Sequence, residues 1–229
     1  MYKIAYRIMA CYERREMVEE IVKKLEGLDV KVFYDDRPKG ERKGTYYTQL
    51  KCINDALEGD YTHLVLLQDD ILLVNDFDKC IKELIKYKPF DLWTLYCPRI
   101  KHVNSQHPYG QIYPANTWGP GNIIEIELLK DIMKFREDRL PQCIYDDCIY
   151  WMYCWEKRLP VYTTQVALLQ HLGNGKSLLG HGRKDQVSKV WIGEDIYDVV
   201  NWNSRECKKL PYSASKSILE NIYERYGRN

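Results

Sequence analysis

The sequence predicts an α/β fold in which a Rossmann-like, mostly parallel sheet is wrapped by helices. Over residues 1–100, apolar strand-like segments alternate with amphipathic helical patterns, which is typical of parallel sheets built from βαβ units. One segment, THLVLLQDD, is a continuous apolar run of the kind that forms a strand buried on both faces. The 229 residues are 45% hydrophobic and 29% charged, which suits a soluble globular domain.

The elements of the first half follow from spacing and from residues that end helices. Apolar residues recur at helical spacing between Val18 and Leu25, and Gly27 follows them, which predicts an amphipathic helix with a glycine end. In order, we expect strands at 3–9, 30–36, 62–70 and 91–97, with helices around 18–25, 46–57 and 77–84 between them.

The pattern changes beyond residue 98, where proline, glycine, asparagine and aromatic residues are dense up to Asn122. The chain shows no internal repeat and no Gly/Ser linker, so we expect one domain over 1–229, with an irregular second half over 101–229 that completes the site. In this half we expect a strand running into a helix over 122–135, an aromatic-rich helix over 144–159, a long strand or a strand pair ending at His171, and a last helix over 215–227.

Charge and cysteine usage exclude several classes of protein. The formal net charge is +1, so no global field points to nucleic acid or membrane. The sequence contains no run of the about 18 apolar residues that a membrane helix needs. Arg7 interrupts the first apolar run before it could form a signal-peptide core. We therefore expect a cytoplasmic protein without membrane insertion, whose eight cysteines form no CxxC pair and are mostly small buried hydrophobes.

Paired acids close two of the predicted strands, Asp35–Asp36 and Asp69–Asp70. The carboxyl ends of parallel strands meet at one edge, where such folds bind ligands, so we expect all four carboxylates there. An unpaired buried carboxylate is costly, so solvent or a metal ion must compensate. Successive strand residues face opposite ways, so one carboxylate can bind a metal while its neighbour meets a ligand hydroxyl or backbone amides.

Two further features lie in the second half. Asp146 and Asp147 open the aromatic-rich helix, where acids often only cap the first turn or offset the helix dipole. Asp147, Trp151 and Trp155 repeat at a spacing of four, which places them along one helix face. His171 follows an apolar strand and precedes a glycine-bearing loop, and an imidazole with a carboxylate suits manganese or a similar divalent ion.

The order of QDD, YDD and QHLGNGKS resembles that in glycosyltransferases of the GT-A fold, which use nucleotide-sugar donors. The resemblance implies that QDD stands in the place of the DxD metal motif of this family, with Gln68 replacing the first acid. It implies a site for Mn²⁺ or Mg²⁺ with Asp70 as the main ligand and His171 and Asp69 beside it. The QHLGNGKS segment is similar to the HxG…S segment of several such enzymes.

The same resemblance assigns roles to the two halves of the chain. Residues 1–100 would bind the nucleotide-sugar, expected to be a UDP-sugar, and residues 101–229 would bind the acceptor. An acid at a helix start is often the base in inverting members, which implies Asp147, or otherwise Asp146. The predicted donor-binding residues are Ala10, Tyr12, Arg14, Asp35, Asp36, Lys43, Gln49, Gln68, Trp118, Lys176, Ser177 and Arg183.

Other functions fit parts of the pattern. A nucleotidyltransferase shares this kind of sheet, but ACYERREM lacks the glycine of a phosphate loop. A non-catalytic nucleotide-sugar-binding module is a further alternative. The acceptor hydroxyl could belong to a glycan, a protein or a hydroxymethylated phage DNA base. From His171 to Asn229 there are ten Lys/Arg and seven Asp/Glu, a weaker basic surplus than DNA binding usually requires.

Overall fold

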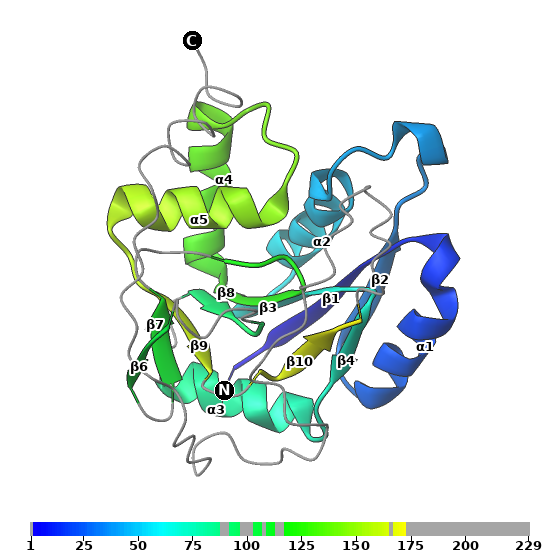
Figure 1. Ribbon diagram of the computed structural model, residues 1–229, viewed down its shortest axis with the longest axis horizontal. Coiled ribbons are helices and arrows are strands. Elements are labelled where there is room, and N and C mark those ends of the chain that lie inside the picture. The colour runs from blue at the N-terminus through cyan, green and yellow to red at the C-terminus, as the bar shows by residue number, and fades with distance from the viewer. Residues whose placement is uncertain are drawn as a thin grey trace.

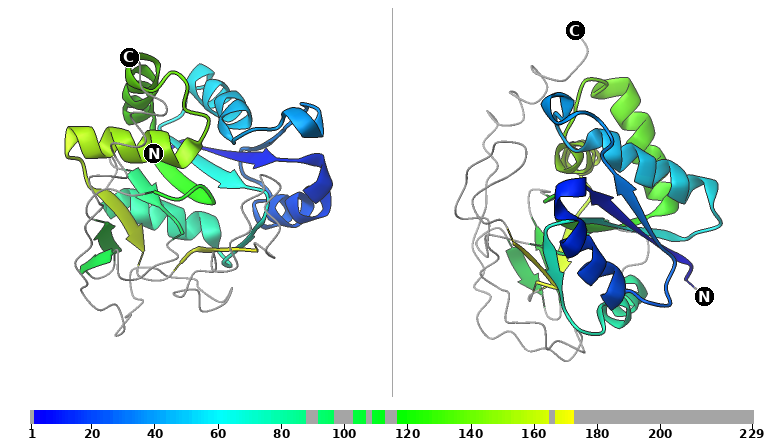
Figure 2. Two further views of the ribbon diagram at one scale, coloured as in Figure 1. Left: turned by 45° about the horizontal axis from the view of Figure 1, so that its top comes forward. Right: turned by 90° about the vertical axis from the view of Figure 1, so that its right-hand side faces the viewer.

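The computed structural model describes residues 2–87, 92–96, 103–106, 109–112, 117–164 and 167–172, with backbone alone for 103–106, 109–112 and Asp146. One sheet forms the middle of the molecule, and helices cover both of its faces (Figures 1 and 2). This arrangement confirms the predicted α/β class.

The sheet has eight described strands in the order β2-β1-β3-β8-β5-β9-β7-β6. The strand β1 runs parallel to β2 and β3, and β5 runs parallel to β9. The strand β8 lies antiparallel between β3 and β5, and β7 lies antiparallel between β9 and β6, so these two are the reversed strands among the eight described in this sheet. The bounds are β1 (Ile4–Ala10), β2 (Val30–Tyr34), β3 (His63–Gln68), β5 (Leu92–Thr94), β6 (Val103–Gln106), β7 (Tyr109–Ile112), β8 (Gly121–Glu125) and β9 (Val161–Thr164).

The helices form a layer on each face of this sheet. The helices α2 (Tyr46–Glu58), α4 (Ile126–Arg139) and α5 (Asp146–Lys157) share one core with it. The helices α1 (Arg15–Lys24) and α3 (Phe77–Tyr87) share the other core. A second small sheet joins β4 (Ile71–Leu73) to β10 (Leu169–His171), and short 3-10 turns occupy η1 (Tyr12–Arg14) and η2 (Lys39–Glu41).

The continuous apolar run of β3 reflects its place between these two cores. Leu64 and Leu66 pack toward α2, α4 and α5, whereas Val65 and Leu67 pack toward α1 and α3. All four side chains are fully buried. Each contributes about 1.5–3 kcal/mol of burial free energy, so both faces of β3 require apolar residues. The strand stops at Gln68, where the chain reaches the sheet edge and polar residues begin.

The second half contains strands that the apolar periodicity of the sequence did not predict. The strands β6 and β7 pair with each other antiparallel within the stretch expected to be irregular. The expected strand or strand pair ending at His171 is a pair, β9 and β10, whose members belong to different sheets. The helix expected at 215–227 lies outside the described residues. Across the described ranges, no helix is both long and apolar enough to cross a membrane.

Candidate functional site

The carboxyl ends of β1, β2 and β3 meet at one edge of the sheet. Met9 lies opposite Gln68, and Ala10 lies opposite Tyr34. Two backbone hydrogen bonds extend this edge beyond the strands: Asp35 N–H donates to the Ala10 carbonyl at 2.8 Å, and Gln68 N–H donates to the Pro120 carbonyl at 3.0 Å. The loops after three parallel strands and the turn before β8 therefore lie together.

Asp69 anchors this edge. Its Oδ2 accepts the Cys11 backbone N–H at 2.7 Å and lies 3.1 Å from Cys11 Sγ. Its Oδ1 lies 2.7 Å from Arg14 Nη1. Burial, followed by the charge of Asp69, raises the pKa of the Cys11 thiol to about 12, so the thiol stays protonated and can donate. Both oxygens of Asp69 thus have partners, and the side chain meets a backbone amide, one of the two roles expected for the neighbour of a metal ligand.

Asp70 faces the second half of the chain. Its side chain is 9% exposed, and its Oδ2 lies 3.2 Å from His171 Nε2 and 2.7 Å from Arg14 Nη1. The antiparallel pairing of β10 with β4 places His171 opposite Ile71, and Leu172 N–H donates to the Asp70 carbonyl at 2.7 Å. Two of the three predicted metal ligands therefore touch.

The electrostatics of Asp70 favour its charged form. Burial alone raises the pKa of the Asp70 carboxyl. The hydrogen bond to His171 and the charges of His171 and Arg14 outweigh burial and hold this pKa below its ordinary value. A carboxylate that stays ionised at neutral pH is ready to bind a cation.

Asp70 and His171 have donor atoms of the kinds that divalent ions use. Asp70 Oδ1 and His171 Nδ1 are buried without a hydrogen-bond partner among the described residues, which is unusual for polar atoms. A carboxylate oxygen and an imidazole nitrogen suit Mn²⁺, and Mg²⁺ sites commonly use one or two carboxylates with substrate phosphates and water. Within the described ranges, no group of three or more His, Cys, Asp or Glu side chains could hold a metal.

Asp147 lies at the start of α5 and contacts the segment that leads to β8. Thr117 Oγ1 donates to the Asp147 carbonyl at 2.7 Å, and three residues further along the chain the Pro120 carbonyl accepts the Gln68 N–H. The half-buried Asp147 side chain accepts the Cys148 N–H at 2.9 Å, as an acid in a first helical turn does. Desolvation raises the pKa of its carboxyl. The helix-capping interpretation and the catalytic one are therefore both compatible with this position.

The remainder of α5 lies against the core. Trp151 is buried, and its Nε1 has no hydrogen-bond partner among the described residues, whereas Trp155 is partly exposed. The face that Asp147, Trp151 and Trp155 share is thus half-buried at Asp147, buried in the core at Trp151 and partly exposed at Trp155. Of Asp146, the structure places the backbone alone, as the first residue of α5.

The loop before α2 connects the first half of the chain to the segment before α5. The backbone N–H groups of Thr45 and Tyr46 both donate to the Ile144 carbonyl at 3.0 Å. Gly44 has a φ of 71°, and a Cβ there would lie 2.2 Å from the same oxygen. Only glycine fits this close approach without displacing Ile144.

The predicted donor-binding residues occupy different environments. Tyr12 is 58% exposed and stacks on Tyr34 with centroids 4.6 Å apart. Asp35 is paired with Arg37 at 2.7 Å. Ala10 and Gln68 lie at strand ends, Asp36 bonds Tyr47 and Lys51, Lys43 is exposed, and Trp118 is half-buried between the two cores.

Gln49 lies in the first turn of α2. It is fully buried, and its amide donates to the Tyr150 hydroxyl, which ties α2 to α5. This contact supports a packing role, and the donor-binding role stays a prediction. Lys176, Ser177 and Arg183 lie outside the described residues.

The sequence pattern did not mark several residues that contact predicted site residues or hold the loops beside them. Tyr34 and Thr117 contact predicted site residues, and Arg37 and Ile144 hold neighbouring loops. Tyr34 could have been found from its position at a strand end. Thr117 and Ile144 contribute contacts across the two halves, which no local pattern marks.

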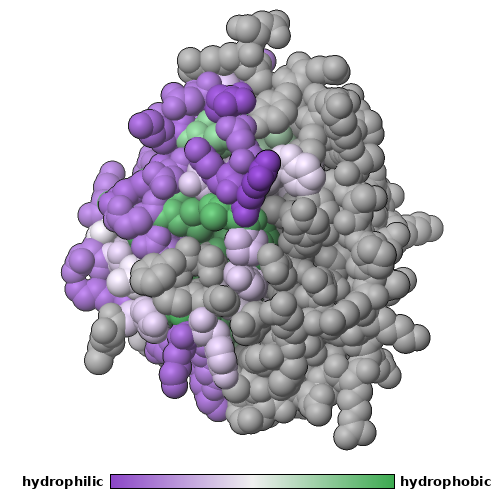
Figure 3. All heavy atoms as spheres, turned by 90° about the vertical axis from the view of Figure 1, so that its left-hand side faces the viewer, coloured by the Kyte–Doolittle hydropathy of each residue, from purple (hydrophilic) through white to green (hydrophobic). Residues whose placement is uncertain are grey.

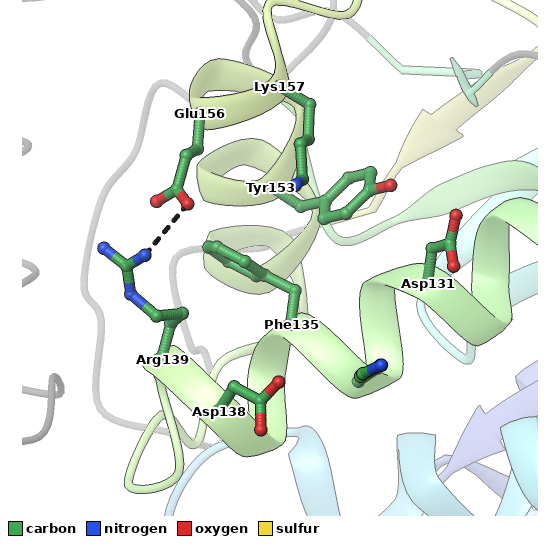
Figure 4. Close-up of a pocket in the computed structure, with 8 residues that line it drawn as sticks. Asp131, Phe135, Asp138, Arg139, Tyr153, Glu156 and Lys157 are labelled. Atoms are coloured by element: carbon green, nitrogen blue, oxygen red, sulfur yellow. Dashed lines mark hydrogen bonds and ion pairs between the residues drawn. The ribbon is translucent and has the colours of Figure 1, made fainter.

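A surface cavity of about 570 Å³ lies elsewhere, between α4 and α5. Figure 4 shows Phe135 and Tyr153 between the helices and the Arg139–Glu156 ion pair at the rim. On the side of the molecule drawn in Figure 3, hydrophilic side chains surround small hydrophobic areas. The cavity contains none of the predicted site residues; it is lined by Asp131, Lys134, Phe135, Asp138, Arg139, Tyr153, Glu156 and Lys157.

The sequence matches no protein-family model and no curated protein. Among solved structures, a glycosyltransferase involved in glycosylation of the major capsid of PBCV-1 has a TM-score of 0.47 and 14% identity, over 76% of this chain and 95% of that one. A197 from STIV has a TM-score of 0.46 and 14% identity, over 72% and 83%. The inositol-1-phosphate CTP transferase from T. maritima has a TM-score of 0.39 and 13% identity, over 69% and 65%. Likeness at this level assigns no activity to this chain.

Proposed function

We propose that this chain is a metal-dependent glycosyltransferase that moves a sugar from a nucleotide-sugar, with a UDP-sugar as the expected donor, to a hydroxyl acceptor. The observation that carries the proposal is the contact of Asp70 with His171 at the carboxyl edge of the sheet. Each of these residues keeps a buried polar atom that has no hydrogen-bond partner among the described residues. The QDD motif supports the same assignment by its place after a doubly buried strand.

The leaving group explains why a cation belongs at this position. A nucleoside diphosphate gains negative charge as the glycosidic bond breaks, and an ion held by Asp70 and His171 would stabilise that charge. Arg14 lies beside the same carboxylates and adds a guanidinium suited to phosphate oxygens. These three side chains would hold the diphosphate end of the donor.

Asp147 would act as the base. Its carboxylate takes the proton of the acceptor hydroxyl while the hydroxyl oxygen attacks the anomeric carbon and the bond to the diphosphate breaks. A positioned base of this kind contributes about 10²–10⁴ in rate. The raised pKa of Asp147 suits a group that must accept a proton, and a single displacement inverts the anomeric centre. Asp146, its neighbour, is the other candidate for this role.

The nucleoside would lie over the ends of β1 and β2. The exposed Tyr12 ring, backed by Tyr34, offers an aromatic face for a base. Asp35 could accept a ribose hydroxyl if Arg37 shifts, as acids at this position do in related nucleotide folds. Trp118, half-buried near Gln68, would contact the donor sugar or the acceptor.

A product analysis tests this proposal. The protein is incubated with UDP-, GDP-, ADP- and CMP-sugars, with and without Mn²⁺, and the products are identified by mass spectrometry. A glycosyltransferase releases the nucleotide and a free or transferred sugar from one donor, and only with the metal. For comparison, the protein is also incubated with a nucleoside triphosphate and a sugar 1-phosphate, the substrates of a nucleotidyltransferase. Release of pyrophosphate from that mixture alone would assign a nucleotidyltransferase, and metal-dependent binding without turnover would indicate a binding module.

The acceptor is identified by a second screen. Once a donor is known, glycans, unfolded and folded proteins, and DNA containing hydroxymethylated bases are compared as acceptors. The acceptor class is the one whose mass increases by that of a single sugar. All three are hydroxyl acceptors and would use the same base.

A further inference from the structure

We propose that Arg14 is an internal counter-ion of the Asp69–Asp70 pair, and that a divalent ion displaces it from Asp70 toward the diphosphate of the donor. The inference rests on the metal site of the proposed function. It starts from one atom: Nη1 of Arg14 lies 2.7 Å from Asp69 Oδ1 and 2.7 Å from Asp70 Oδ2. A single cationic nitrogen thus bridges two adjacent carboxylates.

The bridge compensates an otherwise costly arrangement. Asp69 and Asp70 are both more than nine-tenths buried, and neighbouring buried anions repel one another. Removal of one partner of a buried ion pair leaves an uncompensated charge in a poorly solvated site. Arg14 therefore stabilises the metal-free protein.

A metal ion must compete for the same oxygen. Asp70 Oδ2 is the atom that faces both Arg14 and the His171 ring. An ion that contacts Asp70 and His171 would bring two positive charges close to the guanidinium, and like charges at this distance repel strongly. Asp70 Oδ1, buried without a partner among the described residues, offers the ion a first ligand before Arg14 leaves.

Asp69 limits how far the Arg14 side chain must move in this displacement. The Cys11 N–H holds Asp69 Oδ2 in place, so Asp69 keeps its position when Asp70 binds a metal. Arg14 can stay attached to Asp69 Oδ1 while it releases Asp70. This explains why two adjacent acids are present although one of them is turned toward the backbone.

The displaced guanidinium would meet the donor. Arg14 belongs to η1, directly after β1, and its side chain is one-fifth exposed. Its Nε and Nη2 have no hydrogen-bond partner among the described residues. A guanidinium matches phosphate oxygens in a planar, two-pronged geometry. Metal binding would therefore prepare the site for the diphosphate, and the two ligands would bind with positive coupling.

Calorimetric titrations of Arg14→Gln and wild type separate this role from a structural one. In the first titration Mn²⁺ is added without nucleotide. In the second, the tightest binder among UDP, GDP, ADP and CDP is added at saturating Mn²⁺. We expect Arg14→Gln to bind Mn²⁺ about tenfold more tightly, because the competing charge is gone. We expect it to bind the nucleoside diphosphate about tenfold more weakly, because a charge-assisted contact is lost.

Two further variants complete the experiment. Arg15→Gln changes the next residue, which is exposed and paired only with Glu19 among the described residues, and should leave both affinities unchanged. Arg14→Lys keeps the charge if the glutamine variant folds poorly, and should show smaller changes of the same sign.

The outcomes are distinct. Mn²⁺ binding by wild type that Arg14→Gln and Arg14→Lys leave unchanged or weaken would overturn the displacement, while the metal site of the proposed function would stand. Failure of the wild type and both Arg14 variants to bind Mn²⁺ would overturn both. Binding of Mn²⁺ by an Arg14 variant alone would support the displacement in its strongest form.

Discussion

His171 lies with its Nε2 3.2 Å from Asp70 Oδ2, although α3, α4 and α5 separate the two residues along the chain. The pairing of β10 with β4 produces this contact, because it places His171 opposite the residue that follows Asp70. The second half of the chain therefore completes an edge that the first half begins. The candidate site therefore contains residues from both halves of the chain.

Asp70→Asn tests the metal ligand. The substitution keeps the shape of the side chain but removes its charge, so Mn²⁺ affinity should fall by more than about a hundredfold, since loss of an outer-shell partner alone costs about 10- to 100-fold. Calorimetry measures the affinity, and circular dichroism checks that the fold is retained. Wild-type turnover by this variant at limiting Mn²⁺ would exclude Asp70 as a ligand.

Asp147→Asn tests the base. Sugar transfer should fall by about 10²–10⁴, while affinities for the donor and Mn²⁺ stay near those of wild type. Transfer rates and donor titrations are measured on the same preparation, with Asp146→Asn as the matched neighbour. A parallel loss of donor binding would mean that Asp147 holds the donor. A transfer-only defect in Asp146→Asn instead would assign the base to Asp146.

The pH dependence of kcat follows from the pKa of Asp147. A protonated carboxyl cannot accept a proton, so activity is lost as the pH falls through this pKa. Desolvation raises it, so the acid limb should have its midpoint above the value of about 4 of an ordinary aspartate. The profile is recorded at saturating donor and Mn²⁺. A rate that stays constant down to about pH 4 would argue against a desolvated base.

Gly44→Ala should loosen the start of α5. A Cβ at this position meets the Ile144 carbonyl at 2.2 Å, and the φ of 71° is unfavourable for alanine. We expect a loss of about 2 kcal/mol or more in unfolding free energy, measured in urea, together with a lower transfer rate. Gly40→Ala is the control, because nothing lies within 4 Å of its Cβ, and it should change stability by less than about 0.5 kcal/mol. Equal effects of the two changes would contradict this packing.

Arg7 should be a major contributor to stability. Its side chain is 0% exposed within β1 and binds Asp29 at 2.9 Å, Asp55 at 2.5 Å and the Tyr61 hydroxyl at 3.0 Å. Arg7→Met leaves these acids without their buried partner and should cost about 3 kcal/mol in urea unfolding, at the low end for broken buried pairs because Asp29 is half-exposed. Lys3→Met, which breaks the exposed pair with Asp60, should change little. A small effect of Arg7→Met would show that the network is unimportant.

Short stretches of the sequence were enough to predict the helices and strands that carry a clear apolar pattern. The apolar run of β3 and the helical spacing of α1 each follow from burial against the layers beside them, and both are confirmed. The position of Asp69 and Asp70 at the sheet edge follows from where the run of β3 ends. The positions of β3, α1 and the two acids can therefore be predicted from residue type and apolar periodicity.

Long-range pairing was not predictable in the same way. The antiparallel insertion of β8 between β3 and β5, and the pairing of β7 with β9, depend on contacts between distant segments. The bridge that Arg14 forms between Asp69 and Asp70 depends on such contacts too. The sequence predicted Arg14 as a donor-binding residue, whereas its contacts with both carboxylates depend on how the chain brings the ends of β1 and β3 together.

Crystals grown with Mn²⁺ and the preferred nucleoside diphosphate test the central claim most directly. The anomalous signal of manganese locates the ion independently of any assumption about its ligands. We predict one peak in contact with the Asp70 carboxylate, the His171 ring and the diphosphate. A bound nucleotide at the β1–β3 edge with no manganese peak at these residues would contradict the account.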